Sequence, residues 1–536
     1  MRPRTRRGPP LRVLFVTAEL APWAKVGGLG EVSRDLPLAL MTAGIDIRLL
    51  VPAYTALRKA FPAATQDTPL MMLGGGFAPA QFMRVDTPVP AYLLDCPAYF
   101  ERAGDPYQSA ERADWPDNHL RFGLLSRAAA LFASAANPFD WQPDVIHCHD
   151  WMTGPVGAYL EREPAPTPTV MTIHNLAHQG IFPQHVLDEL GLQAHGLNSF
   201  EYLRNAFFLA AGLRHATKLT TVSPTYAREI QTPELGFGLD AVLRQRRHDL
   251  VGILNGVDSQ VWNPTRDPYL PHRRGPGELS HKAAAKLVLQ RSLRLPERAD
   301  VPLLGIVARF AHQKGLDLVI DAASAIVQLP AQIVVLGQGE RHIEETLRAL
   351  AARHAGAVAA HIGFDERLAH QVIAGSDIFL MPSRFEPCGL TPMQAALNGT
   401  PAVARRTGGL ADTIVDATDE AHNARTATGF LFDDATPDAL LDAVRRAIAL
   451  YRHPDAWKCI QRSAMARNFS WSAAVPAYAQ IYRNALQVHY RRHDPAATDE
   501  PHCRLSGTII HDRQADTGKR NPGRATRMTR ADPVER

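Results

Sequence analysis

The chain has 536 residues, enough for about two to four domains of ordinary size. Hydrophobic residues make up 46% and charged residues 21%, values typical of a globular protein, and no apolar run reaches the ~18 residues that a membrane-spanning helix requires. The net charge of +4 argues against a dedicated nucleic-acid binder, and five scattered cysteines without a C-x-x-C pair argue against a disulfide framework and favour the cytoplasm.

The chain begins with a basic stretch at 1–10, which we predict to be a disordered extension. An apolar run at 11–18 follows, so the start could be taken for a secretory signal. Arg12 interrupts this run, however, and Glu19 ends it. Because the run also leads directly into a glycine-rich loop, we interpret it as the first buried strand and favour this over export.

The sequence KVGGLGEV at 25–32 joins this strand to a predicted helix. It matches neither the dinucleotide fingerprint nor the P-loop, because Lys25 precedes the glycines. Gly27, Gly28 and Gly30 would still bring backbone N–H groups to a helix N-terminus, which favours an anion. The alternative is a tight strand-to-helix turn that binds no ligand.

Short apolar runs alternate with longer amphipathic segments through the first half of the chain. This alternation predicts parallel βαβ units with helices on both faces of the sheet, in an N-terminal Rossmann-like domain at 11–262. The predicted strands are 11–18, 46–52, 91–95, 144–149, 169–174, 217–222 and 251–254. The clearest predicted helices are 118–136 and 200–214.

The alternation breaks at 263–300, which is rich in Pro, Gly and Arg. We predict that this segment is a partly ordered connection between domains. The alternation restarts in a C-terminal Rossmann-like domain at 301–470. Its predicted strands are 302–308, 332–337, 358–363, 377–382, 401–404 and 429–432.

Clear signals mark the helices near the end of the chain. Thr436 is a predicted N-cap and Pro437 the first residue of the helix that follows. A C-terminal helix is predicted at 471–487. The remaining segment, 488–536, is polar, charged and poor in aromatic residues, so we predict a disordered tail.

The predicted fold class is therefore α/β, with two doubly wound Rossmann-like domains facing each other across a deep cleft. Ligands of such sheets bind beyond the carboxyl ends of the strands. The active or binding site is expected in the cleft, where closure of the two domains would exclude water.

Several polar side chains follow predicted strands of the first domain. His147 and His149 alternate with an apolar residue and share one face of a strand, and Asp150 comes directly after it. His174 and His178 follow the next strand, so a metal site has to be considered. We favour the simpler interpretation, in which these groups line a polar cleft or bond the backbone.

The second domain carries two cations at the end of its first predicted strand. Arg309 ends the strand and Lys314 precedes a helix, an arrangement suited to a diphosphate. A surface charge pair without a ligand is the alternative.

A loop at 382–391 follows a later strand of the same domain and contains Glu386 and Cys388. The backbone amides of Gly389, Leu390 and Thr391 could meet a phosphate or a sugar hydroxyl, and a second group of amides lies at 407–410. Cys388 could be a nucleophile, but no base for it is evident.

Seven motifs now stand in order along the chain: KVGGLGEV, HCHDW, TIHNLAHQG, NGVD, ARFAHQKGLD, PSRFEPCGL and RRTGGLADT. Together they resemble bacterial glycogen synthases, members of the glycogen/starch synthase family of retaining glycosyltransferases. The resemblance covers residues 11–487. It implies the GT-B fold and glucosyl transfer from ADP-glucose to the non-reducing end of an α-1,4-glucan such as glycogen, with no cofactor, no metal, no nucleic acid and no membrane partner.

The resemblance also implies roles for individual residues. Those expected to take part in catalysis are Glu386, His174, Asp150, Arg309 and Lys314. Those expected to bind the donor are Lys25, Gly27, Gly28, Asn255, Arg309, Lys314, Phe364, Glu386, Cys388, Gly389, Leu390 and Thr391. Phe364 falls where the family has an aromatic ring near the adenine. Glu31 stands where many relatives carry Asp, on the glucose side, and Gln394 stands where the wider group of retaining relatives carries a second Glu.

Three alternatives remain at this point. One is a glycan-binding protein on the same scaffold without activity, against which the retained Lys25, Arg309, Lys314 and Glu386 argue. Another is a transferase that uses UDP-glucose and a small acceptor, as in sucrose synthesis. A phosphorylase would need a pyridoxal lysine, which no motif provides. Whether the chain is a monomer or a homo-oligomer is left open.

Overall fold

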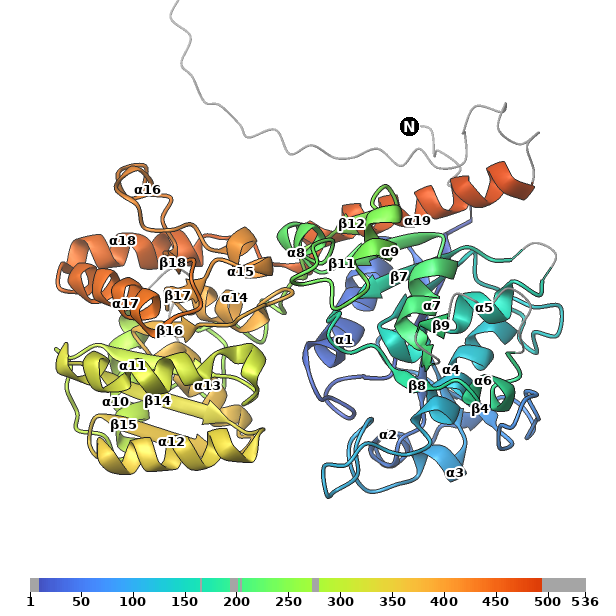
Figure 1. The fold of residues 1–536 in the computed structure, drawn as a ribbon, viewed down its shortest axis with the longest axis horizontal. Coiled ribbons are helices and arrows are strands. Elements are labelled where there is room, and N and C mark those ends of the chain that lie inside the picture. Colours follow the sequence, from blue (N-terminus) through green and yellow to red (C-terminus); the bar gives the residue numbers. More distant parts are fainter. Residues whose placement is uncertain (1–8, 164–165, 193–200, 203–204, 272–278, 494–536) are drawn as a thin grey trace, which may run out of the picture. The chain divides into compact units, whose positions relative to one another are not determined.

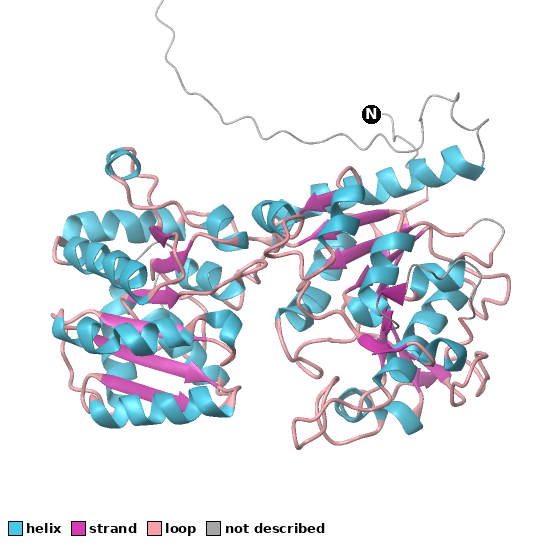
Figure 2. Ribbon diagram, viewed as in Figure 1, coloured by secondary structure: helices cyan, strands magenta, loops and turns pink. Residues whose placement is uncertain are grey.

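The computed structural model describes residues 9–163, 166–192, 201–202, 205–271 and 279–493 (Figure 1). In this part of the chain, helices cover parallel sheets, as the cyan and magenta elements of Figure 2 show. No helix among the described residues is both long enough and apolar enough to cross a lipid bilayer.

The first sheet has nine strands in the order β12-β11-β7-β6-β1-β2-β5-β4-β3. Its bounds are β1 Arg12–Val16, β2 Asp46–Pro52, β3 Thr65–Gln66, β4 Gln81–Val85, β5 Ala91–Asp95, β6 Val145–His149, β7 Thr169–Ile173, β11 Lys218–Thr221 and β12 Leu250–Gly252. All seven predicted strands are present and pair in parallel. The antiparallel edge strands β3 and β4 are not predicted by the alternation, because they belong to no βαβ unit.

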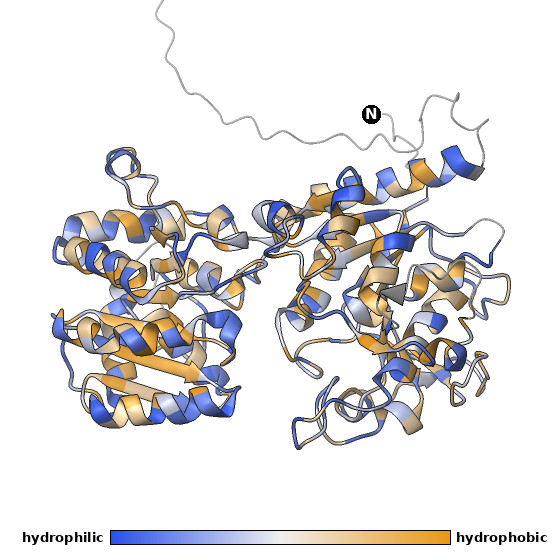
Figure 3. Ribbon diagram, viewed as in Figure 1, coloured by the Kyte–Doolittle hydropathy of each residue, from blue (hydrophilic) through white to orange (hydrophobic). Residues whose placement is uncertain are grey.

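The second sheet has six parallel strands in the order β15-β14-β13-β16-β17-β18, and all six are predicted. Its bounds are β13 Leu303–Val307, β14 Gln332–Gly337, β15 Val358–Ile362, β16 Ile378–Met381, β17 Ala402–Arg405 and β18 Gly429–Phe432. Figure 3 shows these strands as apolar along their length. Such continuous apolar strands are typical of parallel sheets that are covered on both faces.

Alternate residues of the second sheet enter different cores. Leu304 and Ile333 pack with apolar residues of helices α11 (Leu316–Gln328), α12 (Arg341–Arg353) and α17 (Pro437–Tyr451). Their neighbours Leu303 and Val334 pack with residues of α10 and α13. Because side chains alternate along a strand, the two sets of helices cover opposite faces of the sheet.

The helices of the first half include α1 Gly28–Thr42, α2 Thr55–Ala60, α3 Pro97–Phe100, α4 Asn118–Leu131, α5 Val156–Leu160, α6 Val186–Glu189, α7 Phe208–His215, α8 Pro224–Glu229 and α9 Asp240–Gln245. Those of the second half also include α10 Ser280–Ser292, α13 Glu366–Gly375, α14 Leu390–Leu397, α15 Gly408–Thr413, α16 Asp419–Asn423, α18 Pro454–Met465 and α19 Trp471–His493. The predicted cap of α17 is confirmed: the Thr436 side chain accepts a hydrogen bond from the Ala439 amide, and Pro437 begins the helix.

Two predicted helices are shorter than expected. The helix predicted at 118–136 ends at Leu131. The one predicted at 200–214 begins only at Phe208, because Asn205–Phe207 forms strand β10. This strand pairs with β8 (Ile181–Pro183) and β9 (Glu201–Tyr202) in a small antiparallel sheet, so tertiary pairing overrides the helical pattern.

The segment predicted as a connection contains a helix, α10, that packs against α13. Lys282 and Lys286 lie on its buried side. The Lys282 ammonium group donates to the carbonyls of Ala374 and Ser376 and to the Thr400 hydroxyl, each at 2.6 Å. Burial lowers the pKa of Lys282 to about 7. Lysine side chains are expected on the solvent face of a helix. Because two of them lie on the buried side of α10, the sequence shows no apolar stripe that would predict this helix.

The last helix, α19, packs against α1 and against strands β6 and β7 of the first sheet. It extends to His493, beyond the predicted end at 487, so residues 488–493 are helical where a disordered tail was expected. The rest of that predicted tail, and the extension at 1–8, lie outside the described residues. The predicted domain boundaries remain predictions.

Candidate active site

The glycine-rich loop lies between β1 and α1 and is organised by a buried carboxylate, that of Glu19. One oxygen of Glu19 accepts hydrogen bonds from the amides of Val26, at 2.9 Å, and Gly27, at 3.2 Å. Its other oxygen accepts from the Tyr107 hydroxyl at 2.7 Å. Burial raises the pKa of Glu19. The Gly27 amide, expected to face an anion, is therefore already hydrogen-bonded.

The exposed side of the same loop carries Lys25 and Glu31, whose side chains form an ion pair at 2.7 Å. Two glycines allow close approaches here. A Cβ on Gly30 would lie 3.1 Å from the Lys25 side chain, and one on Gly28 would lie 3.2 Å from Leu390 at the start of α14. The loop thus brings Gly28, at the start of α1, against Leu390 at the start of α14 in the second half.

His147 is fully buried behind the site and has both ring nitrogens engaged. Nε2 lies 2.7 Å from the Thr172 hydroxyl, and Nδ1 lies 2.9 Å from the hydroxyl of Tyr482 on α19. Burial lowers the pKa of His147 to about 3, so the ring is neutral near pH 7. These contacts give His147 a structural role, because they join strand β6 to β7 and to α19.

His149, Asp150 and His174 form one hydrogen-bonded group. His149 Nδ1 lies 2.9 Å from His174 Nε2, and Asp150 Oδ1 accepts from the His174 amide at 2.7 Å. Burial lowers the pKa of His174 to about 3 and raises that of Asp150 to about 7. The described residues contain no cluster of three or more His, Cys, Asp or Glu side chains that could hold a metal ion.

The cations expected to bind diphosphate differ in their surroundings. Arg309 follows β13 and is exposed. Lys314 ends a short 3-10 turn (His312–Lys314), and its ammonium group lies 2.6 Å from Glu386 Oε2. The same oxygen accepts from the Ser383 hydroxyl at 2.9 Å. Lys314 and Glu386 are both largely buried, so the structure brings this predicted cation and carboxylate into direct contact.

The loop after Glu386 leads into α14. Gly389 precedes the helix with φ of 82°, a left-handed conformation that favours glycine, and Leu390 and Thr391 form the first turn. Cys388 is buried and its thiol contacts the backbone of Asn255. Burial raises the pKa of Cys388 to about 12, so the thiol stays protonated and is unsuited to nucleophilic attack.

Two further predicted donor contacts are Asn255 and Phe364. Asn255 is buried, and its side-chain oxygen has no hydrogen-bond partner within the part of the chain that the structure describes. Phe364 follows β15 and is 73% exposed. An open ring of this kind can stack on a nucleotide base, and a buried unpaired carbonyl can accept from a sugar hydroxyl.

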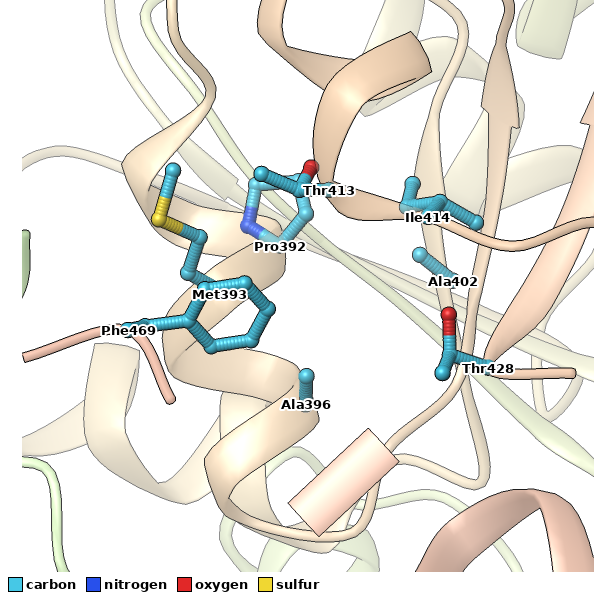
Figure 4. A pocket seen from close by; sticks show the side chains of 8 residues that line it. All are labelled: Pro392, Met393, Ala396, Ala402, Thr413, Ile414, Thr428 and Phe469. Carbon is cyan, nitrogen blue, oxygen red and sulfur yellow. The ribbon is translucent and has the colours of Figure 1, made fainter. Parts of the chain in front are cut away.

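A small apolar pocket lies beside α14, and none of the residues that line it is a predicted site residue (Figure 4). Its lining comprises Pro392, Met393, Ala396, Ala402, Thr413, Ile414, Thr428 and Phe469. The volume of about 10 Å³ accommodates at most one water molecule. The pocket is therefore too small for a sugar nucleotide.

Glu19, Tyr107 and Ser383 belong to the site but are not among the predicted site residues, although Ser383 lies within the motif PSRFEPCGL. Glu19 does carry a signal, since it is an acidic residue directly after the first buried strand, where a parallel sheet binds its ligands. Tyr107 carries none, because its partner Glu19 is 88 residues away.

Family models and known proteins match most of the chain. The family model described as starch synthase catalytic domain matches residues 12–245, and the model for glycosyl transferases group 1 matches residues 293–463. A glycogen synthase from Dechloromonas aromatica (strain RCB) is 45% identical over 479 residues, which cover 89% of this chain and 99% of the relative. One from Aromatoleum aromaticum (strain DSM 19018 / LMG 30748 / EbN1) is 46% identical over 483 residues, with 89% and 98% covered.

Solved structures give the same picture. The catalytic domain of starch synthase IV from Arabidopsis thaliana, bound to ADP and acarbose, is 30% identical with a TM-score of 0.80, and the match covers 89% of this chain and all of that one. Sucrose-phosphate synthase from Thermosynechococcus elongatus, at 18% identity and a TM-score of 0.56, with 89% and 100% covered, shares the fold alone. The predicted GT-B fold is confirmed, and the chain belongs to the glycogen/starch synthase family of glycosyltransferases.

Proposed function

We propose that this glycosyltransferase transfers glucose from ADP-glucose to the non-reducing end of an α-1,4-glucan, with retention of the anomeric configuration, in cytoplasmic glycogen biosynthesis. The observation that carries the proposal is the contact between Lys314 and Glu386 at 2.6 Å. It sets a cation suited to a departing phosphate beside a carboxylate suited to a positive sugar carbon. The ADP and acarbose in the Arabidopsis starch synthase support the same ligand classes.

The leaving group of this reaction is a nucleoside diphosphate, whose negative charge grows as the glycosidic bond breaks. Fixed cations stabilise such a charge most when they are already in place. Arg309 is exposed and turned to solvent, and Lys25 lies on the exposed glycine loop. Lys25 and Lys314 are paired with Glu31 and Glu386 in this structure, so the diphosphate would take the place of a carboxylate beside each of them. With Arg309 they are the three cations assigned to the leaving group, in a route proposed to proceed without a divalent cation.

The glucosyl carbon becomes positively charged in the same step, as in other glycosyl transfers. Glu386 and Asp150 are the carboxylates assigned to this charge or to the sugar hydroxyls. His174 is neutral because its pKa lies at about 3, so its ring acts as a hydrogen-bond partner and not as a cation. Asn255 is assigned to the sugar side of the donor.

Retention without a nucleophile requires a front-face route. The bond from the anomeric carbon to the diphosphate oxygen breaks, and a bond from that carbon to the acceptor 4-hydroxyl oxygen forms on the same face. The hydroxyl proton passes to the departing diphosphate. Cys388 cannot supply a covalent intermediate while its thiol is protonated, which favours this route over a double displacement at sulfur.

A radiolabel assay tests the proposal directly. ADP-glucose and UDP-glucose are offered separately, each with glycogen and with glucose as acceptor, in buffer containing EDTA. Base discrimination is expected to come from hydrogen bonds at the edge of a base stacked on Phe364, and we expect at least about tenfold higher kcat/KM with ADP-glucose. Equal use of both donors, or incorporation into glucose alone, would contradict the proposal. A loss of activity in EDTA that Mg²⁺ restores would contradict the metal-free route.

A further inference from the structure

Helix α8 of the first half supplies the cap of helix α15 in the second. The Glu229 carboxylate, at the end of α8, accepts from the Thr407 hydroxyl at 3.0 Å and from the Gly408 amide at 2.9 and 3.0 Å. Thr407 is the N-cap residue of α15, but its own side chain makes no capping bond within that helix. The first turn of α15 therefore depends on a carboxylate from 178 residues away.

The contact is reciprocal. Asp412, on α15, accepts from the Thr225 amide at 2.8 Å and from the Thr225 hydroxyl at 2.7 Å. Thr225 lies in the first turn of α8. Each short helix thus gives a carboxylate to the N-terminal turn of the other, where backbone amides and the helix dipole both favour negative charge. The two helices are held as a pair.

On one side, this pair rests on the loop of Glu386. The Gly409 amide donates to the Glu386 carbonyl at 3.0 Å. A Cβ on Gly408 would lie 1.9 Å from the same carbonyl oxygen, and one on Gly409 would lie 2.0 Å from that of Cys388. With backbone packed directly on backbone, a shift of α15 would move the Glu386 loop with it.

On the other side, the pair contacts the turn that carries His174. Tyr226 of α8 is fully buried, and its hydroxyl accepts from the Leu176 amide at 3.0 Å. Ser223 fixes the start of α8 by accepting from the Tyr226 amide at 3.1 Å. Helix α8 therefore contacts the turn of His174 directly and is joined to the loop of Glu386 through α15.

We infer that α8 is a positioning element for the reaction, and that Glu229 and Tyr226 set Glu386 at its working distance from His174. Neither residue touches the reacting atoms. The inference rests on the proposed function for the roles of His174 and Glu386. A displacement of about 1 Å at such a site lowers the rate by up to ~10²-fold, so loss of either contact should act on kcat.

The test compares the full-length chain with Glu229→Gln, Tyr226→Phe and the double variant. Glu229→Gln keeps the length of the side chain but loses one acceptor oxygen, and Tyr226→Phe loses the acceptor for Leu176 alone. Glu297→Gln is the matched control, because that exposed carboxylate pairs with Arg291 and, within the described residues, touches neither α8 nor α15. The measurements are kcat and KM for ADP-glucose, ADP affinity by calorimetry, thermal unfolding, and hydrogen exchange of residues 172–178 and 383–391.

Each single variant is expected to lower kcat about tenfold or more, with ADP affinity changed less than about threefold. Both contacts are inferred to fix the same distance, that between Glu386 and His174. The fold-decrease in kcat of the double variant should therefore be smaller than the product of the two single decreases. Exchange should rise in 383–391 for Glu229→Gln and in 172–178 for Tyr226→Phe, with no change in the control. A merely structural role predicts multiplicative losses that follow thermal stability.

The outcomes separate the two proposals. Normal kcat and unchanged exchange in both folded variants would overturn the positioning role while leaving the function intact. A second outcome is that hydrogen exchange rises in the variants but the wild-type chain transfers no glucose from either donor. That result would support the positioning of the two loops by α8 and would overturn the proposed glucosyl transfer. If Glu229→Gln fails to fold, the kcat and hydrogen exchange of Tyr226→Phe decide whether α8 has the positioning role, because that variant removes the contact with the His174 turn.

Discussion

Burial shifts the pKa of several ionisable side chains of the candidate site, and the shifts of His174 and Asp150 bear most directly on the proposed reaction. His174 stays neutral at neutral pH, because its pKa is lowered to about 3. Asp150 accepts hydrogen bonds from the amides of His174 and Asn175, which favour its charge, but burial outweighs them and its pKa rises to about 7. Asp150 is thus a carboxylate of the candidate site that changes charge near physiological pH.

The pH dependence of activity should therefore report Asp150. If its carboxylate holds the sugar or steadies the positive carbon, kcat/KM rises with pH through a midpoint near 7. Asp150→Asn should have a much lower kcat/KM, and its kcat/KM should no longer rise with pH near 7. His147→Gln should keep that rise. A rise that persists in Asp150→Asn would assign the titration to another group.

The raised pKa of Asp150 also makes the free energy of unfolding depend on pH, in one direction only. The folded state of an acid with a raised pKa binds its proton more tightly than the unfolded state, for which the value is 3.8. The contribution of Asp150 to folding therefore falls as pH rises from about 4 to about 7. Asp150→Asn should remove this dependence, as denaturant titrations at several pH values would show.

Two substitutions in the Glu386 loop distinguish the role of the Glu386 charge from a role of the Cys388 thiol. Glu386→Gln keeps the shape of the side chain but loses the charge, and kcat should fall about 10²-fold. ADP affinity should not weaken, because Lys314 loses a competitor for phosphate. Cys388→Ser should have a far smaller effect, comparable to that of Cys459→Ser on α18. Abolished turnover in Cys388→Ser with normal ADP binding would show that the thiol takes part after all.

At the scale of elements, the site depends on how closely loops and helix ends approach one another. Gly409 lets α15 lie against the Cys388 carbonyl, where an added Cβ would be 2.0 Å away. Gly27 meets no such constraint, since a Cβ added there would have no neighbouring atom within 4 Å. One glycine is thus needed for packing, and the other is open toward the side where the donor is proposed to bind.

Substitution by alanine separates these two roles. Gly409→Ala should lower the free energy of unfolding by about 1–3 kcal/mol through overpacking. Gly27→Ala should leave it within about 0.5 kcal/mol, yet raise KM for ADP-glucose, because a methyl group would stand where the donor approaches. Calorimetric unfolding and steady-state kinetics on both variants provide the check. An unchanged KM in Gly27→Ala would argue that the loop is only a turn.

At the scale of the whole molecule, α19 ties the end of the chain to the first sheet. Its Tyr482 is fully buried and shares a hydrogen bond with His147 of β6, 335 residues earlier. Strand β6 also ends at His149, which contacts His174. The docking of the last helix thus supports the floor of the candidate site.

Removing this single hydroxyl tests the docking. Tyr482→Phe leaves His147 Nδ1 buried without its partner, and the free energy of unfolding should fall by about 1–3 kcal/mol. Tyr490→Phe, near the end of the same helix and 50% exposed, should be neutral. Equal stability of the two variants in denaturant titrations would indicate that water or another group replaces the lost bond.

The amino-acid sequence by itself determined the elements whose signals are local. Parallel strands such as β1 and β13 are continuous apolar runs, because both faces of the sheet are covered. The cap of α17 is determined by Thr436 and Pro437 at adjacent positions. The order of the short motifs was enough to indicate the family, and with it the residues expected at the site.

Only the tertiary structure decided the partners of those residues. Strand β10 and helix α10 contradict their local patterns, since pairing with β8 and packing on α13 outweigh them. The position of Glu19 after the first strand indicates a place near the site but not its partners, and Glu229 has no signal at all. In the folded chain Glu19 organises the glycine loop and Glu229 caps a helix of the second half. Periodicity records which side of a segment is buried, but a hydrogen bond between distant positions forms only when the whole chain has folded.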